Sequence, residues 1–175
     1  MFIMSNKILI IGSTGTLGSK LYNFCLKNNI SIFALTSYRN KKKLLSQKKK
    51  LNSKFSFNLS DLIEKEKFIF FLKKNKFKLV YFLDYGSYSL TYLNILIKNN
   101  KNCIFAIANK EMIIAGGHKL RKDINASKNK LIPLDSEHYS LINHKFNNLN
   151  ISKIYITASG GPFYFNKNLN LSNVN

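Results

Sequence analysis

The fold is decided near the start of the chain, by the stretch Lys7-Ile8-Leu9-Ile10-Ile11-Gly12-Ser13-Thr14-Gly15-Thr16-Leu17-Gly18. Its first part is a short apolar run, which is typical of a parallel strand that is covered on both faces. An amphipathic helix pattern begins where the glycines end. Because Gly12, Gly15 and Gly18 lie between strand and helix, backbone amides and the helix N-terminus can approach a phosphate closely. The stretch therefore predicts a dinucleotide site, and the alternative is a structural turn.

Further along the chain, apolar runs of strand length alternate with helical patterns. Since such alternation implies parallel strands joined by right-handed crossovers, we predict an α/β fold with a Rossmann-like, doubly wound parallel sheet. Besides the first strand, the expected strands are Ile30–Thr36, Leu79–Leu83, Ile104–Ala108 and Lys130–Leu134. The expected helices are one capped by Asp61 and ending near Asn75, Tyr92–Lys98 and Met112–Ser127, whereas Lys41–Lys54 is expected to be an exposed connection or a ragged helix.

The regular alternation of strand and helix patterns ends after Leu134. A short helix-like stretch, a strand at Ile151–Thr157 and the segment Ser159-Gly160-Gly161 follow. We therefore predict two domains, with residues 1–134 as the nucleotide-binding domain and residues 135–175 as the beginning of a second, α+β domain. The second part is too short to bury a core of its own.

The chain is strongly basic. Its 28 Lys and Arg against 8 Asp and Glu give a formal net charge of +20, which could indicate a nucleic-acid or anionic-membrane partner. Yet Arg39 and Arg121 are the only arginines, and no recognised motif organises the lysines, so nucleic acid is the weakest hypothesis. No apolar run approaches the roughly 18–20 residues needed to cross a bilayer. We expect a cytoplasmic protein without a membrane partner, whose charge attracts phosphorylated ligands.

The end of the second predicted strand bears on the choice of nucleotide. Sites that prefer NAD usually place an acid there to hold the ribose 2′-hydroxyl, whereas NADP sites place a basic residue near the 2′-phosphate. Here the sequence reads Ser37-Tyr38-Arg39-Asn40, with no acid and one of the two arginines. The stretch favours NADPH, and the alternative is that Arg39 is one more surface cation.

Asp135 and Glu137 stand two positions apart, directly after the predicted strand Lys130–Leu134. In an extended stretch this spacing puts the carboxylates of Asp135 and Glu137 on one side, where they would repel unless a cation lay between them. A divalent ion such as Mg²⁺ or Mn²⁺ suits oxygen ligands. His138 is interpreted as a structural histidine or a neighbour of the ligands, and His118 and His144 as surface residues.

Two further segments could contribute to a site. Asn109-Lys110-Glu111 follows a buried strand at the carboxyl edge of the sheet, where ligands bind in such folds, and the alternative is a salt-bridged helix start. Ser159-Gly160-Gly161 combines a hydroxyl with exposed amides and could hold a substrate phosphate or hydroxyl. An ordinary turn before Pro162 explains it about as well. Cys25 and Cys103 form no Cys-x-x-Cys pair, and we expect buried, unreactive thiols.

Taken together and in this order, these segments resemble the 1-deoxy-D-xylulose 5-phosphate reductoisomerase family. The resemblance rests on Gly12-Ser-Thr-Gly-Thr-Leu-Gly18, Ala108-Asn-Lys-Glu111, Pro133-Leu-Asp-Ser-Glu-His138 and Ser159-Gly-Gly-Pro-Phe163. For the cofactor it implies NADPH, held at its phosphates by Thr14, Gly15, Thr16 and Leu17, at its adenosine end by Arg39 and Asn40, and on its ribose and nicotinamide side by Asn109, Lys110 and Glu111. For the reaction it implies metal ligands at Asp135 and Glu137, substrate contacts at Ser136, Glu137 and Ser159, and catalytic roles for Lys110 and Glu137.

The function implied by the resemblance is the NADPH-dependent conversion of 1-deoxy-D-xylulose 5-phosphate to 2-C-methyl-D-erythritol 4-phosphate, in the non-mevalonate isoprenoid pathway. The partner is then a small phosphorylated sugar, and the family forms homodimers. The family's lid, third metal carboxylate and C-terminal helices have no counterpart here, so we expect a truncated member, for which dimerisation stays open. Near the nicotinamide, the family's glycine-rich stretch is replaced by Leu83-Asp84-Tyr85-Gly86-Ser87-Tyr88. The alternative function is that of a non-catalytic NADP-binding remnant.

Overall fold

The structure, a computed structural model, describes residues 7–143 together with Lys153 and Tyr155. The chain divides into two compact units, Met1–Ser140 and Leu141–Asn175. Nearly all described residues lie in the first unit. The predicted strand at Ile151–Thr157, apart from Lys153 and Tyr155, and the segment Ser159-Gly160-Gly161 lie outside the described residues.

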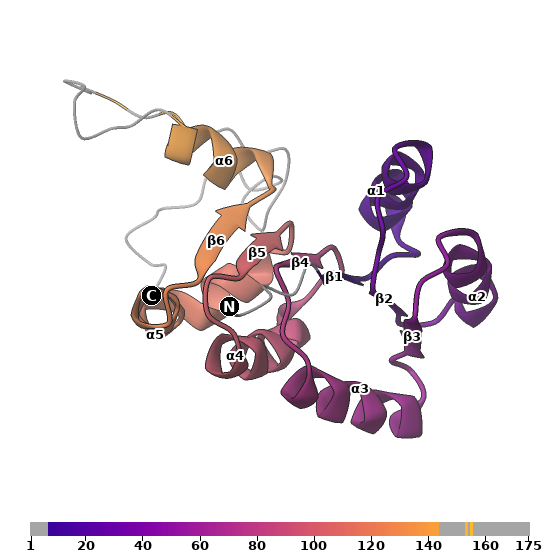
Figure 1. Cartoon of the computed structure of the whole chain (residues 1–175). Helices are drawn as coiled ribbons and strands as arrows, with labels where there is room; N and C mark the ends of the chain where they lie inside the picture. Colours follow the sequence, from indigo (N-terminus) through magenta and orange to yellow (C-terminus); the bar gives the residue numbers. More distant parts are fainter. Residues whose placement is uncertain (1–6, 144–152, 154, 156–175) are drawn as a thin grey trace, which may run out of the picture. The chain divides into compact units, whose positions relative to one another are not determined.

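The first unit is built on a six-stranded parallel sheet with the order β3-β2-β1-β4-β5-β6 (Figure 1). This is the strand order of the Rossmann fold, so the predicted doubly wound α/β class is confirmed. The strands are β1 (Ile8–Ile11), β2 (Ala34–Ser37), β3 (Phe55–Asn58), β4 (Leu79–Phe82), β5 (Ile104–Ile107) and β6 (Lys130–Pro133). The helices are α1 (Thr16–Lys27), α2 (Lys41–Lys50), α3 (Leu62–Lys74), α4 (Leu90–Asn99), α5 (Lys110–Ala126) and α6 (Ser136–Asn143), with a 3₁₀ turn η1 (Ser87–Ser89) before α4.

Helices cover both faces of the sheet. Along β1, Leu9 and Ile11 point to one face and Ile10 to the other, as the alternation of a strand requires. The first face packs against α3, α4 and α5, and the second against α1 and α2. Because both faces are covered, the central strands are apolar throughout, which is why their sequence reads as continuous hydrophobic runs.

The contact between α1 and β1 depends on two glycines. A Cβ atom on Gly18 would lie 2.1 Å from the carbonyl oxygen of Gly12, and one on Gly12 would lie 2.7 Å from the backbone nitrogen of Asp84. Gly12 also has a φ of +84°, a backbone conformation that favours glycine. A Cβ on Gly15 would have its nearest neighbour at 3.6 Å, which is ordinary contact. The first and third glycines are therefore needed for packing.

Three elements differ from the sequence-based prediction. Strand β2 begins at Ala34 rather than at Ile30, and Phe55–Asn58 forms an edge strand that was not predicted. Helix α5 is interrupted by Gly117, which has a φ of 49°, so Met112–Ser127 is not one continuous helix. The edge strand is hard to recognise because it has four residues and alternates aromatic and polar side chains, and among the described strands it pairs with β2 alone.

The lysine-rich segment is a regular helix, which decides between the two alternatives stated for it. Helix α2 buries Leu44 and Gln47 on one face, and the side chain of Asn40 caps it by accepting a hydrogen bond from the Lys43 amide. The predicted cap of α3 is confirmed, because Asp61 accepts from the amides of the first turn. A few buried positions and one cap are enough to fix a helix in which six of the ten residues are lysines.

Among the described residues, both edges of the sheet are short. Strand β3 forms one edge and β6 the other, and each has four residues. Strand β6 begins with the exposed Lys130 and ends with Pro133, which has no backbone N–H.

The structure shows the surroundings of the two cysteines and the length of the helices within the described residues. Cys25 and Cys103 are free and buried, and burial raises the pKa of both thiols, that of Cys103 to about 12. The prediction that both thiols are buried is confirmed, and their low reactivity stays a prediction that the raised pKa values favour. None of the helices within residues 7–143 is long and apolar enough to cross a membrane.

Gly18→Ala should destabilise the protein more strongly than Gly15→Ala. The added methyl group at Gly18 would meet backbone that cannot move without shifting β1 or α1, and overpacking of this kind typically costs about 1–3 kcal/mol. The matched change at Gly15 makes only ordinary van der Waals contacts and should cost less than about 1 kcal/mol. Chemical denaturation of both variants measures the two free energies of unfolding. Equal values would contradict the packing role of Gly18.

Candidate functional site

The parallel strands bring the predicted site segments to one edge of the sheet. Gly12 follows β1, Arg39 follows β2, Asp84 follows β4, Asn109 follows β5 and Asp135 follows β6. In a doubly wound sheet, ligands bind outside the carboxyl ends of the strands, at the point where the strand order reverses. That point lies between β1 and β4, so the glycine loop and the Asp84 segment flank it.

The glycine loop presents an open helix N-terminus. Gly15 is the N-cap of α1, and no side chain caps the first turn. Gly15, Thr16 and Leu17 are exposed, and the side chain of Leu17 is half exposed. Free amides of a first turn together with the positive end of the helix dipole form a favourable place for a phosphate. The structure therefore leaves the predicted phosphate-binding residues accessible.

The base of the glycine loop is held rigidly by β2 and α2. The amides of Gly12 and Ser13 donate to the Thr36 hydroxyl and carbonyl oxygens, at 3.1 and 2.9 Å. The Ser13 hydroxyl donates to Gln47 Oε1 at 2.7 Å, and Gln47 Nε2 donates to the Ser13 carbonyl at 3.0 Å. Gln47 is buried, and sequence reasoning missed it. The available signal was its spacing from Leu44, which puts both on one helix face within a run of lysines.

Lys43 is the second residue of this region that sequence reasoning missed. Its ammonium donates to the Thr14 carbonyl at 2.9 Å and to the Ser19 hydroxyl at 2.7 Å. The neighbouring Lys41 forms an ion pair with Glu64 at 3.2 Å. The start of α2 thus brings a cation onto the glycine loop, although the sequence shows only a solvated lysine run.

The residues that follow β2 are exposed, as a nucleotide contact requires. The Arg39 guanidinium lies 5.7 Å from the ring centroid of Tyr38, which is itself 61% exposed. The side chain of Asn40 is engaged as the α2 cap. Of the two residues predicted to meet the adenosine end, Arg39 is therefore exposed beside Tyr38 and Asn40 has a structural role as well.

Asn109 links two of the segments at the strand ends. Its Oδ1 accepts from the Met112 amide at 3.1 Å, which caps α5, and its Nδ2 donates to the Gly86 carbonyl at 2.6 Å. Asn109 is buried, while Lys110 and Glu111 in the first turn of α5 are exposed. The amide of Asn109 positions this segment against the loop after β4.

Asp84 is a largely buried acid beside the glycine loop. Its Oδ2 accepts from the Ser89 hydroxyl, and its Oδ1 is buried without a hydrogen-bond partner among the described residues. Burial raises the pKa of Asp84 above its ordinary range, against the opposing effect of the Ser89 hydrogen bond. Tyr85 and Tyr88, the bulky residues of the same loop, are 88% and 55% exposed.

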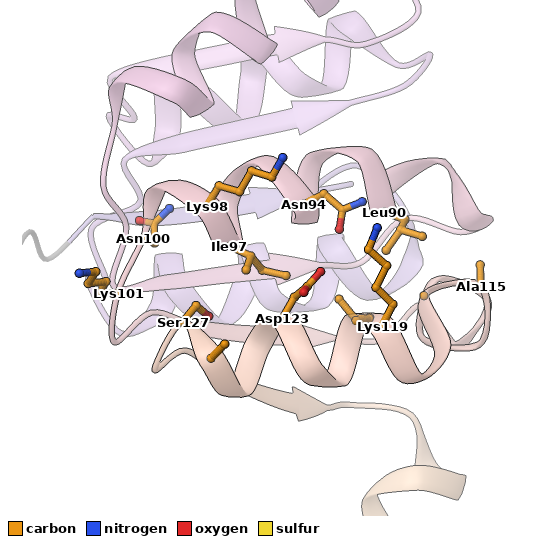
Figure 2. A pocket seen from close by; sticks show the side chains of 13 residues that line it. Leu90, Asn94, Ile97, Lys98, Asn100, Lys101, Ala115, Lys119, Asp123 and Ser127 are labelled. Carbon is orange, nitrogen blue, oxygen red and sulfur yellow. The ribbon is translucent and has the colours of Figure 1, made fainter.

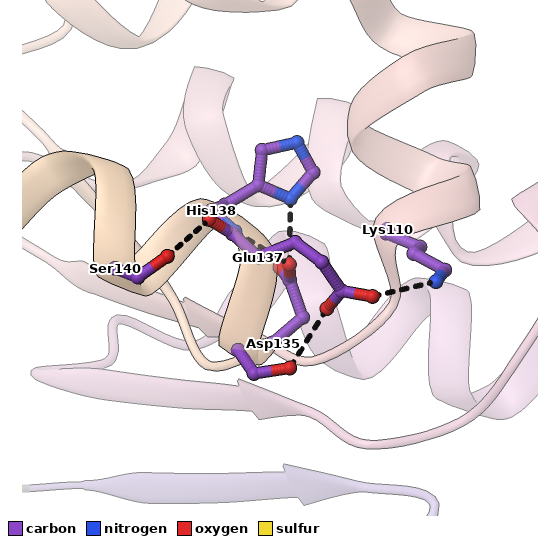
Figure 3. Close-up of polar contacts among 6 residues, drawn as sticks. Lys110, Asp135, Glu137, His138 and Ser140 are labelled. Carbon is purple, nitrogen blue, oxygen red and sulfur yellow. Dashed lines mark hydrogen bonds and ion pairs between the residues drawn. The ribbon is translucent and has the colours of Figure 1, made fainter. Parts of the chain in front are cut away.

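The two predicted metal-binding acids lie at the start of α6, which corrects the extended geometry expected for them (Figure 3). Asp135 Oδ1 accepts from the backbone amide of His138 at 2.9 Å and lies 2.7 Å from His138 Nδ1. The Glu137 carboxylate instead lies 3.4 Å from Lys110 Nζ and accepts from the Ser136 hydroxyl at 2.9 Å. A helix starts here because Asp135 caps it, and capping turns the acids toward different partners.

The carboxylates of Asp135 and Glu137 differ in burial and in hydrogen bonding. Asp135 Oδ2 is buried and has no hydrogen-bond partner among the described residues. Glu137 is exposed, and its own amide, the Ser136 hydroxyl and the Lys110 ammonium lower its pKa. Within the part of the chain that the structure describes, no group of three or more acidic, histidine or cysteine side chains could hold a metal.

A separate hollow lies between α4 and α5 (Figure 2). Its volume is about 660 Å³, and its polar lining includes Asn94, Lys98, Lys119 and Asp123. None of the predicted site residues that the structure describes lines it. The hollow is therefore distinct from the residues gathered at the strand ends.

Comparisons with known protein families match both parts of the chain. The model of the NAD dependent epimerase/dehydratase family matches residues 8–107. The model of the 1-deoxy-D-xylulose 5-phosphate reductoisomerase C-terminal domain matches residues 131–175.

Curated proteins similar to this chain are named 1-deoxy-D-xylulose 5-phosphate reductoisomerase. A 1-deoxy-D-xylulose 5-phosphate reductoisomerase of Pelagibacter ubique is 39% identical over 94% of this chain and 47% of the relative. One of Clostridium tetani is 28% identical over 95% of this chain and 49% of the relative. The chain thus spans about half the length of the curated relatives that it matches.

Solved structures agree on the fold. The reductoisomerase of Zymomonas mobilis in complex with NADPH superposes with a TM-score of 0.73 at 24% identity, covering 92% of this chain and 47% of that one. A reductoisomerase structure with fosmidomycin and magnesium gives a TM-score of 0.70 at 19% identity, covering 98% of this chain and 50% of that one. At these identities the likeness confirms the Rossmann-like fold.

Asp84→Asn should stabilise the protein at neutral pH and have little effect in acid. Because the folded pKa of Asp84 is raised, the folded state binds its proton more tightly than the unfolded chain does. The contribution of Asp84 to stability is fully present at pH values below its pKa in the unfolded chain, near 3.8. It is lost as pH rises through the pKa of Asp84 in the folded protein. The advantage of the variant, measured by urea denaturation across this range, should therefore grow with pH. An advantage that does not change with pH would contradict the argument.

Proposed function

We propose a function from the premise that this chain belongs to the 1-deoxy-D-xylulose 5-phosphate reductoisomerase family and, through residues 8–107, to the NAD dependent epimerase/dehydratase family. In this proposal the chain binds NADPH at the carboxyl edge of its sheet and a divalent metal at Asp135 and Glu137. The whole protein converts 1-deoxy-D-xylulose 5-phosphate to 2-C-methyl-D-erythritol 4-phosphate. Residues 1–134 form the nucleotide domain, and residues 135–175 begin the catalytic domain.

The observation that carries the proposal is the geometry of the glycine loop. The loop lies at the reversal of strand order, and α1 begins there without a side-chain cap. The missing side chains of Gly12 and Gly18 allow the loop to pack closely, while Gly15 leaves its outer side open. A dinucleotide pyrophosphate needs this combination of free amides and close backbone approach. The residues present therefore fit the cofactor.

Discrimination in favour of NADPH is supported by the end of β2. No acid occurs between Ser37 and Asn40, so nothing there would hold a free 2′-hydroxyl in the manner of NAD-preferring sites. Arg39 is exposed and carries the planar fork that suits a phosphate.

The acids at the start of α6 fit a divalent metal in part. The buried Oδ2 of Asp135, which has no partner among the described residues, is the acceptor that a cation would satisfy. Glu137 is exposed, and its carboxylate can exchange the Lys110 contact for a metal. When bound, a divalent ion polarises the oxygens of a ketone substrate. Lys110, placed beside Glu137, supplies a second positive charge near the same position.

The substrate in this proposal is a small phosphorylated sugar. The net charge of +20 favours the approach of anionic ligands of this kind. Ser136 lies beside Glu137 and offers a hydroxyl to the substrate, whereas Ser159 lies outside the described residues.

Arg39→Gln should weaken NADPH binding about tenfold or more while leaving NADH binding nearly unchanged, because a hydrogen bond to a charged group contributes about 1.5–3 kcal/mol. The matched control is Arg121→Gln, which removes the other arginine from the exposed surface of α5. Fluorescence titration of the unmodified protein and the two variants with NADPH and NADH measures the six affinities. Equal affinity of the unmodified protein for NADPH and NADH would overturn the proposed preference.

Asp135→Asn should abolish or strongly weaken the binding of Mn²⁺. Asparagine keeps the cap of α6, so the change removes charge without removing the helix start. The matched control is Asp123→Asn on α5, which lies in the separate hollow. Binding should be weak even in the unmodified protein, since two carboxylates leave most positions to water. Calorimetric isotherms that are the same with and without Asp135 would show that this acid is not a ligand.

A further inference from the structure

We propose that Lys43 selects NADPH over NADH by binding the adenosine 2′-phosphate, and that Gln47 is the residue that positions it. The inference rests on the proposed function, because it concerns a contact within the same nucleotide site. Neither residue belongs to the segments from which the site was predicted.

The position of the Lys43 ammonium is the first argument. Lys43 belongs to α2, the helix that follows the end of β2, yet its ammonium reaches back to the Thr14 carbonyl and the Ser19 hydroxyl. It therefore joins the two structures between which the adenosine ribose of a dinucleotide lies in a Rossmann site, namely the glycine loop and the end of the second strand. The pyrophosphate, by contrast, belongs at the N-terminus of α1.

The chemistry of the ammonium is the second argument. A lysine ammonium has three donors and no acceptor. Two of its protons are engaged by Thr14 and Ser19, so one is left for a phosphate oxygen. The two existing contacts fix the ammonium without neutralising it, because both partners are uncharged. A fixed, uncompensated cation beside a ribose binds a 2′-phosphate and gains little from a 2′-hydroxyl.

The other cations at the start of α2 are placed differently. Lys41 is paired with the Glu64 carboxylate at 3.2 Å, which offsets its charge. Lys42 is exposed and makes no hydrogen bond or ion pair within residues 7–143. Of the three consecutive lysines that open α2, Lys43 is thus the one whose ammonium lies against the glycine loop.

The contacts of Gln47 explain how the Lys43 ammonium is positioned against the glycine loop. The two residues are four positions apart, so they lie on the same face of α2. Both ends of the buried Gln47 amide bond to Ser13, the residue that precedes Thr14. This pair of buried bonds fixes the rotation of α2 relative to the loop, and with it the reach of Lys43.

The experiment compares Lys43→Gln with Lys42→Gln, which removes the same charge from the same helical turn. Each protein is titrated with NADPH, NADH and 2′,5′-ADP by fluorescence or calorimetry. Lys43→Gln should lose about tenfold in affinity for NADPH and for 2′,5′-ADP and less than about twofold for NADH, whereas Lys42→Gln should match the unmodified protein. Thermal melting confirms that both variants are folded.

The outcomes separate this inference from the proposed function. An unmodified protein that binds neither reduced nucleotide overturns the proposed function and the inference with it. A preference for NADPH that is undiminished in Lys43→Gln overturns the inference alone, whereas a reduced preference that Arg39 still supports agrees with it. Equal losses for NADPH and NADH also overturn it, because they would assign Lys43 to the pyrophosphate or to the shape of the loop.

The role of Gln47 is tested by the ratio of the NADPH and NADH dissociation constants, which a general loss of stability would not move. Gln47→Leu should reduce the preference for NADPH in the unmodified background. The same change in the Lys43→Gln background should leave the ratio as it is, since the positioned group is already gone. An effect on the ratio that is independent of Lys43 would contradict the positioning role.

Discussion

The structure depends on two close contacts between backbone segments, which are possible because Gly12 and Gly18 have no side chains. With no side chain at Gly18, α1 starts against the loop that leaves β1, and with none at Gly12 that loop lies against the segment leaving β4. These two approaches place the helix N-terminus at the reversal of strand order. The other site segments then follow from parallel topology, because every strand ends at the same edge.

Neutral amides, rather than the many lysines, tie the framework together. Gln47 bonds to Ser13, and Asn109 joins α5 to the loop after β4. At the opposite edge, Asn100 accepts from the Phe77 amide and Asn129 from the Cys103 amide. An amide can donate and accept at once without carrying charge into the interior, so it can satisfy buried backbone groups that a lysine cannot.

The sequence was sufficient where the physical signal is local. Apolar runs identified the central strands, and the glycine spacing identified the loop, because burial on both faces and close backbone approach leave direct marks on residue types. Contacts between segments that are distant in the sequence produce no comparable pattern of residue types. The Lys43 and Gln47 contacts with the loop depend on how α2 rotates, and the geometry of Asp135 and Glu137 depends on a helix that begins one residue after Asp135.

The short edges of the sheet bear on how this chain behaves in a crowded solution. A strand at an edge exposes unpaired backbone groups that a second copy can use for sheet-to-sheet aggregation. Here each edge offers four residues, one edge carries Lys130, and Pro133 lacks the donor needed to extend the ladder. Among the described residues, these short edges disfavour aggregation through the sheet, and the surplus of positive charge adds repulsion between copies.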